Sequence, residues 1–455
     1  MAIPNKWHRC RLADVADINP DSLGPDWPYE HMQYVDISSV GEGMLKESPH
    51  RLSLSEAPSR ARRLVKAGDT VLSTVRPNRR SMFFVRETIP DLVVSTGFAV
   101  IRPRQEVIEP LYLYAIVFDR RFTAYLVSRQ RGAAYPAVLP SDIAEAEILL
   151  PPLPEQRAIA RILGTLDDKI ELNRRMNETL EAMAQALFKS WFVDLDPVVV
   201  NALRAGNPIP EKFAARAAHY RDNPDALGLP EDILRLFPAR FVDSELDPIP
   251  EGWEVKALPD IVDIVLGGTP KTSIAEYWGG EVLWASAKDI SNTSDIFITK
   301  TERTITRFGL EKSNAKLLPA GTTVITSRGT VGKLCILGVD MAINQTNYGL
   351  VSHLDVDKYF VYLAMNNLIS TLKQHSHGTI FETITTETLS GVKIVYPRKE
   401  VMDIFSSIVS YFMDNIYCNI LESQTLAALR DALLPKLISG ELRVKDVEKI
   451  LEDAV

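Results

Sequence analysis

The segment that decides the fold runs from Glu155 to Trp191 and reads EQRAIARILGTLDDKIELNRRMNETLEAMAQALFKSW. It contains no proline and predicts one helix on the order of 50 Å long, at ~1.5 Å per residue. A second such segment, EVMDIFSSIVSYFMDNIYCNILESQTLAALRDALL, begins at Glu400. Neither helix could be covered by a domain of ordinary size, so each needs a helical partner.

Heptad spacing predicts a coiled-coil contact row along each helix. The expected contact positions in the first helix are mostly apolar: Ile159, Ile162, Leu166, Lys169, Asn173, Met176, Leu180, Met183 and Leu187. Those in the second helix follow the same pattern: Phe405, Ile408, Phe412, Asn415, Asn419, Glu422, Leu426, Leu429 and Leu433. Asn173 and Asn419 lie at the centres of these rows. Antiparallel packing would join them as a buried pair that fixes the register at a cost in stability.

The chain also matches itself at a fixed offset. Positions 246 residues apart carry related sequence, namely Trp7 and Trp253, Gly132 and Gly378, and Leu187 and Leu433. Between these anchors Gly68 of AGDTVLSTV corresponds to Gly321 of AGTTVITS, at an offset of 253. Two homologous halves separated by insertions and deletions explain the pattern.

Each half begins with short alternating runs bounded by glycine and proline, which are typical of strands. The expected fold class is α/β (mixed α+β), with two homologous domains separated by two long helices. The expected parts are domain 1 (1–154), a central helical spacer (155–195), a connector (196–250), domain 2 (251–398), a C-terminal helical spacer (399–443) and a tail (444–455). The connector should be ordered, because it carries aromatic and aliphatic residues able to dock: Phe213, Tyr220, Leu236, Phe237 and Phe241.

The composition is that of a globular protein, with 455 residues, 46% of them hydrophobic, and a net charge of −8. No stretch reaches the roughly 18 to 20 apolar residues of a membrane helix, and the N-terminus lacks the apolar core of a signal peptide. We therefore expect a cytoplasmic protein without membrane association. Cys10, Cys335 and Cys418 are too few and too far apart for a disulfide framework, and we expect reduced thiols.

The charge is unevenly distributed. Residues 51–131 carry 15 Lys and Arg against 7 Asp and Glu, whereas residues 151–250 carry 12 against 16. A local basic excess favours a polyanion partner, although a solvated arginine-rich surface would give the same count.

A search for catalytic motifs finds near misses only. In SRGTVGKL, Ser327 and Leu334 stand where a P-loop requires glycine and Ser/Thr. Asp225, Glu254 and Lys256 could form a nuclease-like set, but such short patterns recur by chance. The double proline of LLPPLPEQ lacks the flanking residues of an amino-methyltransferase, and the histidines show no HExxH spacing. The sequence predicts neither a catalytic nor a metal site.

Two strand-loop-strand segments, TVLSTVRPNRRSMFFV and TVITSRGTVGKLCIL, carry the candidate DNA-binding residues. They are Arg76, Asn78, Arg79 and Arg80 in the first half, and Ser327, Arg328, Thr330 and Lys333 in the second. Their donors suit guanine edges or phosphate oxygens, and the alternative is an ordinary surface hairpin. Tyr135 and Phe381, in the aligned loops GAAYPAV and GTIFETI, either lie against DNA or pack in the domain.

This arrangement resembles the DNA specificity subunit of type I restriction-modification systems over essentially the whole chain. The resemblance rests on the helix start Leu153–Gln156, the KSWFVD segment at Lys189–Asp194, the IPEGW entry to the second half and the LLPKLISGEL terminus. The second helix departs from the pattern, because Arg398, Lys399 and Glu400 replace its Pro-Glu-Gln start.

The resemblance implies that each half contains a target recognition domain reading one half of a bipartite site in double-stranded DNA. It implies that the two long helices are packed as an antiparallel coiled coil, set the spacing and dock methyltransferase (modification) subunits, with a restriction/translocase subunit as a further partner. S-adenosylmethionine and ATP would then belong to those partners, and the chain would be non-catalytic and hold no cofactor. The alternatives are a stand-alone or fused DNA endonuclease/methyltransferase, for which two repeats leave no room, and a scaffold that binds only protein.

Overall fold

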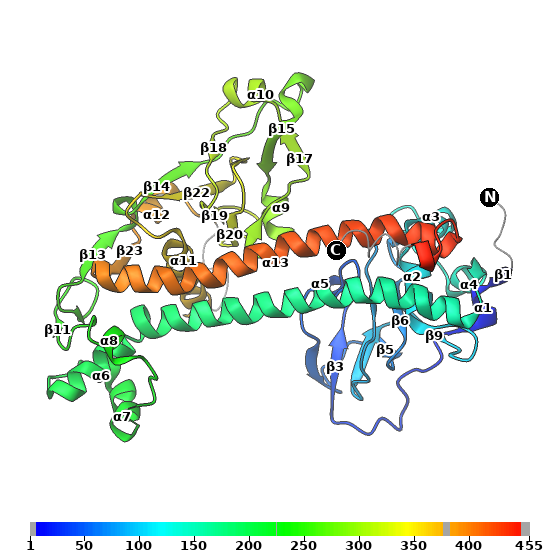
Figure 1. The fold of residues 1–455 in the computed structure, drawn as a ribbon, viewed down its shortest axis with the longest axis horizontal. Helices are drawn as coiled ribbons and strands as arrows, with labels where there is room; N and C mark the ends of the chain where they lie inside the picture. Colours follow the sequence, from blue (N-terminus) through cyan, green and yellow to red (C-terminus); the bar gives the residue numbers. More distant parts are fainter. Residues whose placement is uncertain (1–5, 224, 376–382, 447–455) are drawn as a thin grey trace. The chain divides into compact units, whose positions relative to one another are not determined.

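The computed structural model describes residues 6–223, 225–375 and 383–446, with backbone only for 371–375 (Figure 1). Contacts divide the chain into two compact units. Unit 1 comprises residues 1–172 and 423–455, and unit 2 comprises residues 173–422. Each unit therefore holds one of the two domains together with parts of both long helices.

Domain 1 contains two four-stranded sheets, ordered β2-β9-β6-β7 and β4-β3-β8-β5, and a ladder of β1 with β10. Its strands are β1 (His8–Arg11), β2 (Ala16–Ile18), β3 (His31–Val35), β4 (His50–Ser53), β5 (Ala61–Leu64), β6 (Thr70–Ser73), β7 (Met82–Phe84), β8 (Leu92–Ser95), β9 (Phe98–Pro103) and β10 (Glu147–Leu150). Its helices are α1 (Leu12–Val15), α2 (Pro110–Phe118), α3 (Arg120–Arg129) and α4 (Pro140–Ala144).

The central strands β6 and β9 are apolar on both faces. Val71 and Val100 pack into the core that also holds residues of the β4-β3-β8-β5 sheet, while Leu72 and Ile101 pack with Tyr112 of α2. Successive side chains of a strand point to opposite faces. This explains why these runs are almost continuously apolar.

Domain 2 repeats this plan, with sheets ordered β14-β22-β19-β20-β16 and β17-β15-β21-β18 and a ladder of β13 with β23. Its strands are β13 (Glu254–Ala257), β14 (Val262–Leu266), β15 (Trp278–Ala285), β16 (Phe297–Ile298), β17 (Arg303–Ile305), β18 (Leu317–Leu318), β19 (Thr323–Thr326), β20 (Leu334–Leu337), β21 (Met341–Ile343), β22 (Asn347–Ser352) and β23 (Lys393–Tyr396). Its helices are α9 (Ala287–Asn292), α10 (Arg307–Glu311), α11 (Lys358–His375) and α12 (Thr386–Ser390).

The duplication expected from the sequence is confirmed element by element. β13, α12 and β23 each begin 246 positions after β1, α4 and β10. In between, β19 begins 253 positions after β6, and β22 begins 249 positions after β9. The changing offset locates length differences before and after the β6–β7 and β19–β20 hairpins, and one residue within the hairpin loop, since β20 begins 252 positions after β7.

The first long helix, α5, spans Leu153–Phe188 and continues as a π-helical turn over Lys189–Val193, and the second, α13, spans Lys399–Ser439. They are antiparallel in both units. In unit 1, Arg430 Nη1 lies 2.7 Å from Asp167 Oδ1, and Arg443 Nη1 lies 2.6 Å from Glu155 Oε1. In unit 2, the ring of Phe188 lies 6.1 Å from that of Phe405.

The predicted asparagine pair is only partly correct. Asn173 and Asn419 are neighbours in unit 2, with Asn173 Nδ2 3.4 Å from the Asn419 carbonyl oxygen. Their side chains bond elsewhere, however. Asn173 Nδ2 donates to Glu422 Oε2 at 2.7 Å, and Asn419 Nδ2 donates to Asn177 Oδ1 at 2.9 Å. Only Asn173 is fully buried, so the register is marked by four polar residues instead of one buried pair.

The predicted contact rows also differ from the rows of buried residues along the two helices. Met176 and Met183 are 41% and 47% exposed, and the buried positions of α13 after Phe405 fall one residue later than predicted: Val409, Met413, Ile416 and Ile420. The buried row keeps the heptad spacing of four, three and four residues and is displaced by one position throughout. The displacement arises because α13 packs against its own domain as well as against α5.

We expect Asn173→Leu to raise the melting temperature of the protein, because an apolar side chain replaces a buried amide. Glu422, which loses its hydrogen bond, is exposed and can be solvated by water. The gain should be about 1 kcal/mol, accompanied by a broader distribution of assembled states because the register loses a polar marker. Thermal unfolding and sedimentation velocity measure both effects. Ala182→Leu, at an exposed position of the same helix, is the control and should leave both unchanged.

The described residues of the connector form short helices and one strand pair. The connector contains α6 (Asp196–Ala205), α7 (Ala214–Asp222), α8 (Glu231–Leu234) and the short pair β11 (Phe241–Val242) and β12 (Ile249–Pro250), grouped beyond the end of α5 (Figure 1). Phe213, Tyr220 and Phe237 are buried in it. Trp191, in the π-helical turn that follows α5, lies 5.0 Å from the Phe237 ring and joins the connector to the rest of unit 2.

Candidate nucleic-acid interface

In domain 1, three segments meet at Thr74, the first residue after β6. Its backbone N–H and its hydroxyl both donate to the carbonyl oxygen of Gly97, each at 2.9 Å, and its own carbonyl accepts the N–H of Val138 at 2.9 Å. This ties together the β6–β7 loop, the β8–β9 loop and the segment before α4. We call these three segments, 74–81, 96–97 and 131–138, loop cluster 1.

Domain 2 contains the same three contacts at Ser327. Its N–H and its hydroxyl both donate to the carbonyl oxygen of Thr346, each at 2.9 Å, and its carbonyl accepts the N–H of Ile384 at 3.1 Å. The segments 327–333, 344–346 and 383–385 form loop cluster 2. The hydroxyl of Ser327, predicted to contact DNA, is buried and used for this purpose.

Loop cluster 1 presents polar and aromatic side chains outward. Asn78 and Arg79 are exposed, Arg76 is half-buried, and Tyr135 is 68% exposed. The Arg76 guanidinium lies 5.3 Å from the centre of the Tyr135 ring, so the two predicted residues form a cation–π pair at the surface. Arginine, asparagine and tyrosine side chains all donate to phosphate oxygens, and the first two also read base edges.

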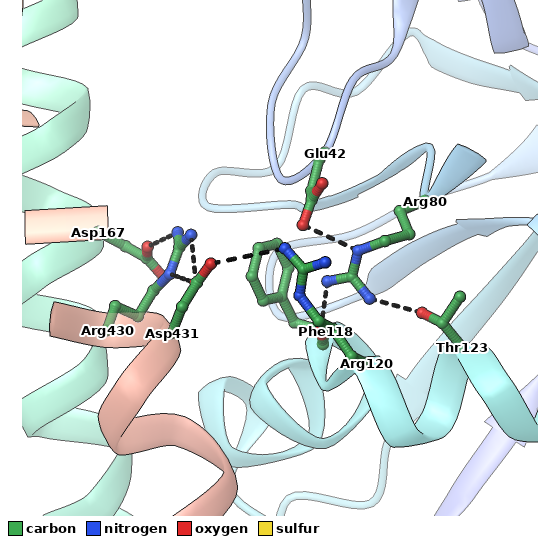
Figure 2. A network of polar contacts seen from close by, with 8 residues as sticks. All are labelled: Glu42, Arg80, Phe118, Arg120, Thr123, Asp167, Arg430 and Asp431. Carbon is green, nitrogen blue, oxygen red and sulfur yellow. Dashed lines mark hydrogen bonds and ion pairs between the residues drawn. The ribbon is translucent and has the colours of Figure 1, made fainter. Parts of the chain in front are cut away.

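Arg80 lies differently from its neighbours. It is buried, and its guanidinium donates to Glu42 Oε1 at 2.8 Å, to Thr123 Oγ1 at 2.6 Å and to the Phe118 carbonyl oxygen (Figure 2). These bonds occupy its donors within the domain. We therefore assign different roles to these arginines. Arg80 holds the loop in place, whereas Arg76 and Arg79 can reach a ligand.

In loop cluster 2, Arg328 and Thr330 are exposed and Lys333 is half-buried. Lys333 lies near two carboxyl groups, Glu181 of α5 and Asp295. Burial raises the pKa of both carboxyl groups, and the positive charge of Lys333 opposes that rise. Lys333 therefore interacts in part with carboxyl groups of the protein itself. Of the two basic residues predicted to bind DNA in this loop, Arg328 is the more accessible. Phe381 lies outside the described residues.

The sequence reasoning overlooked Gln345. It is exposed in the loop between β21 and β22, where the Thr269 hydroxyl contacts its side-chain oxygen. Asn344 Oδ1 shapes this loop by accepting the hydroxyl of Thr346 at 2.9 Å. A short polar run, NQTN, directly after the apolar strand β21 was the signal that could have identified it.

The basic excess of domain 1 is largely neutralised inside the unit. Eight arginines of residues 51–131 form ion pairs: Arg60 with Asp36, Arg80 with Glu42, Arg86 with Asp168, Arg102 with Asp69, Arg104 with Asp17, Arg120 with Asp431, Arg121 with Asp119 and Arg131 with Asp142. Within the described ranges, neither Arg76 nor Arg79 forms an ion pair. The free positive charge is therefore more local than the count suggested.

Two copies of one mixed domain, each with the same tied loop cluster and each packed on antiparallel helices, define a duplicated protein with two equivalent binding surfaces. The chain belongs to the family described as type I restriction modification DNA specificity domain, whose model matches residues 4–182 and 250–430. The two matched segments contain the two domains. The connector lies between them.

Named relatives agree with this assignment. The chain is 30% identical to the specificity subunit of the type I restriction enzyme HindI of Haemophilus influenzae, over 86% of this chain and 90% of that protein. It is 24% identical to the MjaIX specificity subunit of Methanocaldococcus jannaschii, over 98% and 95%. A solved type I restriction-modification S subunit from M. genitalium has a similar fold, with a TM-score of 0.51 at 12% identity over 96% of this chain and 98% of that chain.

Two features are absent from the residues that the structure describes. No helix there is both long and apolar enough to cross a membrane. The same ranges hold no group of three or more His, Cys, Asp or Glu side chains arranged to bind a metal ion.

Proposed function

We propose that this chain is the DNA-recognition subunit of a type I restriction-modification complex, with each loop cluster reading one half of a bipartite site. The observation that carries the proposal is the repeated tie at Thr74 and Ser327, which builds the same loop surface twice. Two equivalent surfaces on one chain suit two half-sites, and the length of the helices would set the spacing between those half-sites.

The same proposal assigns the chemistry to other subunits. Methyltransferase subunits would bind S-adenosylmethionine, a restriction/translocase subunit would bind ATP, and this chain would supply neither site. Exposed apolar side chains on the helices of unit 2, including Met176, Met183 and Tyr411, support a docking role for the helices. Since the partner is chromosomal DNA, we place the complex in the cytoplasm.

Reconstitution tests this division of labour. The purified chain with DNA and S-adenosylmethionine should transfer no methyl groups, and adding the methyltransferase subunits should give methylation of one specific sequence. The methyltransferase subunits without the chain are the control. Methyl transfer by the chain alone would contradict the proposal and favour the fused-enzyme alternative.

Substituting single arginines should weaken binding at one half-site without affecting the other. We expect Arg79→Ala to weaken binding through the half-site read by domain 1, and Arg328→Ala to weaken the other, each by roughly 1–3 kcal/mol. Competition binding with DNA altered in one half-site at a time measures this. A loss at one base pair indicates base readout, and a uniform loss with a shallower salt dependence indicates phosphate contact. Arg51→Ala, an exposed arginine outside the loop clusters, should change neither.

A further inference from the structure

We infer that Arg430, on helix α13, is a positioning residue for the DNA-reading loop of domain 1. The inference rests on the proposed function, because it concerns how the loop carrying Asn78 and Arg79 is held for DNA. The loop and the helix are far apart in the sequence, but within unit 1 both contact the same residue, Phe118.

The connection runs through Phe118, at the end of α2. Its ring is buried, and two guanidinium groups lie over it, that of Arg80 at 5.0 Å and that of Arg430 at 4.5 Å from the ring centre. Figure 2 shows the ring between these two arginines. Arg80 also donates to the carbonyl oxygen of Phe118, so both the ring and the backbone of this residue contact the loop.

Arg430 is itself firmly held. Its guanidinium donates to Asp167 of α5 at 2.7 Å and to the adjacent Asp431 at 2.9 Å, and its side chain is only 15% exposed. Burial raises the pKa of Asp167, and the charge of Arg430 opposes that rise. A buried carboxylate needs its cation, so the helix pair fixes the guanidinium against which Phe118 packs.

The charges of this network balance. Arg80, Arg120 and Arg430 face Glu42, Asp167 and Asp431, with Arg120 Nη2 4.0 Å from Asp431 Oδ2 (Figure 2). Two arginines on one ring are tolerated because each has its own carboxylate partner. The network therefore links the loop, the α2–α3 turn and both helices without a buried net charge.

The loop needs such support because its backbone is strained. Arg76 has φ of 47° and Arg80 has φ of 54°, a left-handed conformation that residues with a Cβ adopt rarely and at a cost. Both residues flank Asn78 and Arg79. Releasing Arg80 from its contacts would let the loop relax and would move the exposed side chains away from the geometry that base readout requires.

A matched control exists in the same unit. Arg443 pairs with Glu155 of α5 at 2.6 Å and lies over an aromatic ring, that of Trp7 at 5.7 Å, just as Arg430 pairs with Asp167 and lies over Phe118. Trp7 donates to Glu155 Oε2 at 2.8 Å and makes no contact with loop cluster 1 among the described interactions. Arg443→Met thus removes an equivalent ion pair and arginine–ring contact without changing any contact of the loop.

The experiment measures binding of the full chain, assembled with its methyltransferase subunits, to the cognate duplex and to duplexes altered in either half-site. For Arg430→Met and Phe118→Leu we expect about tenfold weaker cognate binding and lost discrimination at the half-site of domain 1. Discrimination at the other half-site should be unchanged, and Arg443→Met should preserve both. Circular dichroism and thermal unfolding identify variants that fold.

Unchanged discrimination at the first half-site in folded Arg430→Met would overturn the inference. Equal loss at both half-sites would do the same, since it would indicate a general structural defect. If the unsubstituted chain failed to discriminate at either half-site, the proposed function itself would fail, which is a different result from either of these.

Discussion

Exchanging residues 251–397 for the matching segment of a relative with a different target should change one half of the methylated sequence and leave the other half intact. The physical reason is that each loop cluster is built entirely from its own domain, through Thr74 in one case and Ser327 in the other. Base contacts travel with the domain that carries them. Methylome sequencing of cells carrying the exchanged chain and its methyltransferase measures the result.

The exchange has to preserve the packing of domain 2 on the helices. Trp253 and Phe360 lie within the exchanged segment and contact Phe192, at ring distances of 5.9 Å and 5.3 Å, so the donor segment should keep aromatic residues at both positions. Exchange of domain 1 is the reciprocal control and should change the other half. If both halves changed in either exchange, the assignment of one half-site to each domain would be wrong.

Trp191→Ala should produce the largest loss of stability. The Trp191 side chain is 1% exposed and lies 5.0 Å from the Phe237 ring of the connector and 6.0 Å from the Phe405 ring of α13. Truncating so large a buried side chain costs about 3–5 kcal/mol, because the packing around it cannot close. Urea unfolding of the full chain measures the change in the free energy of unfolding.

Tyr411→Ala, a substitution at a 67% exposed aromatic on α13, is the matched control and should change stability by less than about 0.5 kcal/mol. A loss for Trp191→Ala no greater than for Tyr411→Ala would mean that the connector is not packed on the rest of unit 2 as described.

The duplication and the two long helices could be predicted because their signals are local or regularly spaced. A constant offset of 246 places β13, α12 and β23 without any knowledge of contacts, and a long segment without proline predicts α5. The aromatic residues of the connector were also visible in the sequence. They indicated a packed segment, because buried aromatic side chains need neighbouring side chains to pack against.

The details of the site depend on contacts that the sequence does not reveal. Arg79 and Arg80 are neighbours of the same type, yet one is exposed and the other is buried, because the backbone turns into a left-handed conformation at Arg80. The partner of Phe118 on α13 is hundreds of residues away in the chain. The heptad rows matched the buried face of the helices only in part, because α13 packs against both its domain and α5.

The central claim is that one chain specifies a bipartite target through two equivalent surfaces. Methylome sequencing of cells that express the chain with its methyltransferase subunits tests it most directly. We predict one methylated motif made of two specified half-sites separated by unspecified bases, absent when the chain is omitted. A single uninterrupted motif, or methylation that persists without the chain, would contradict the account.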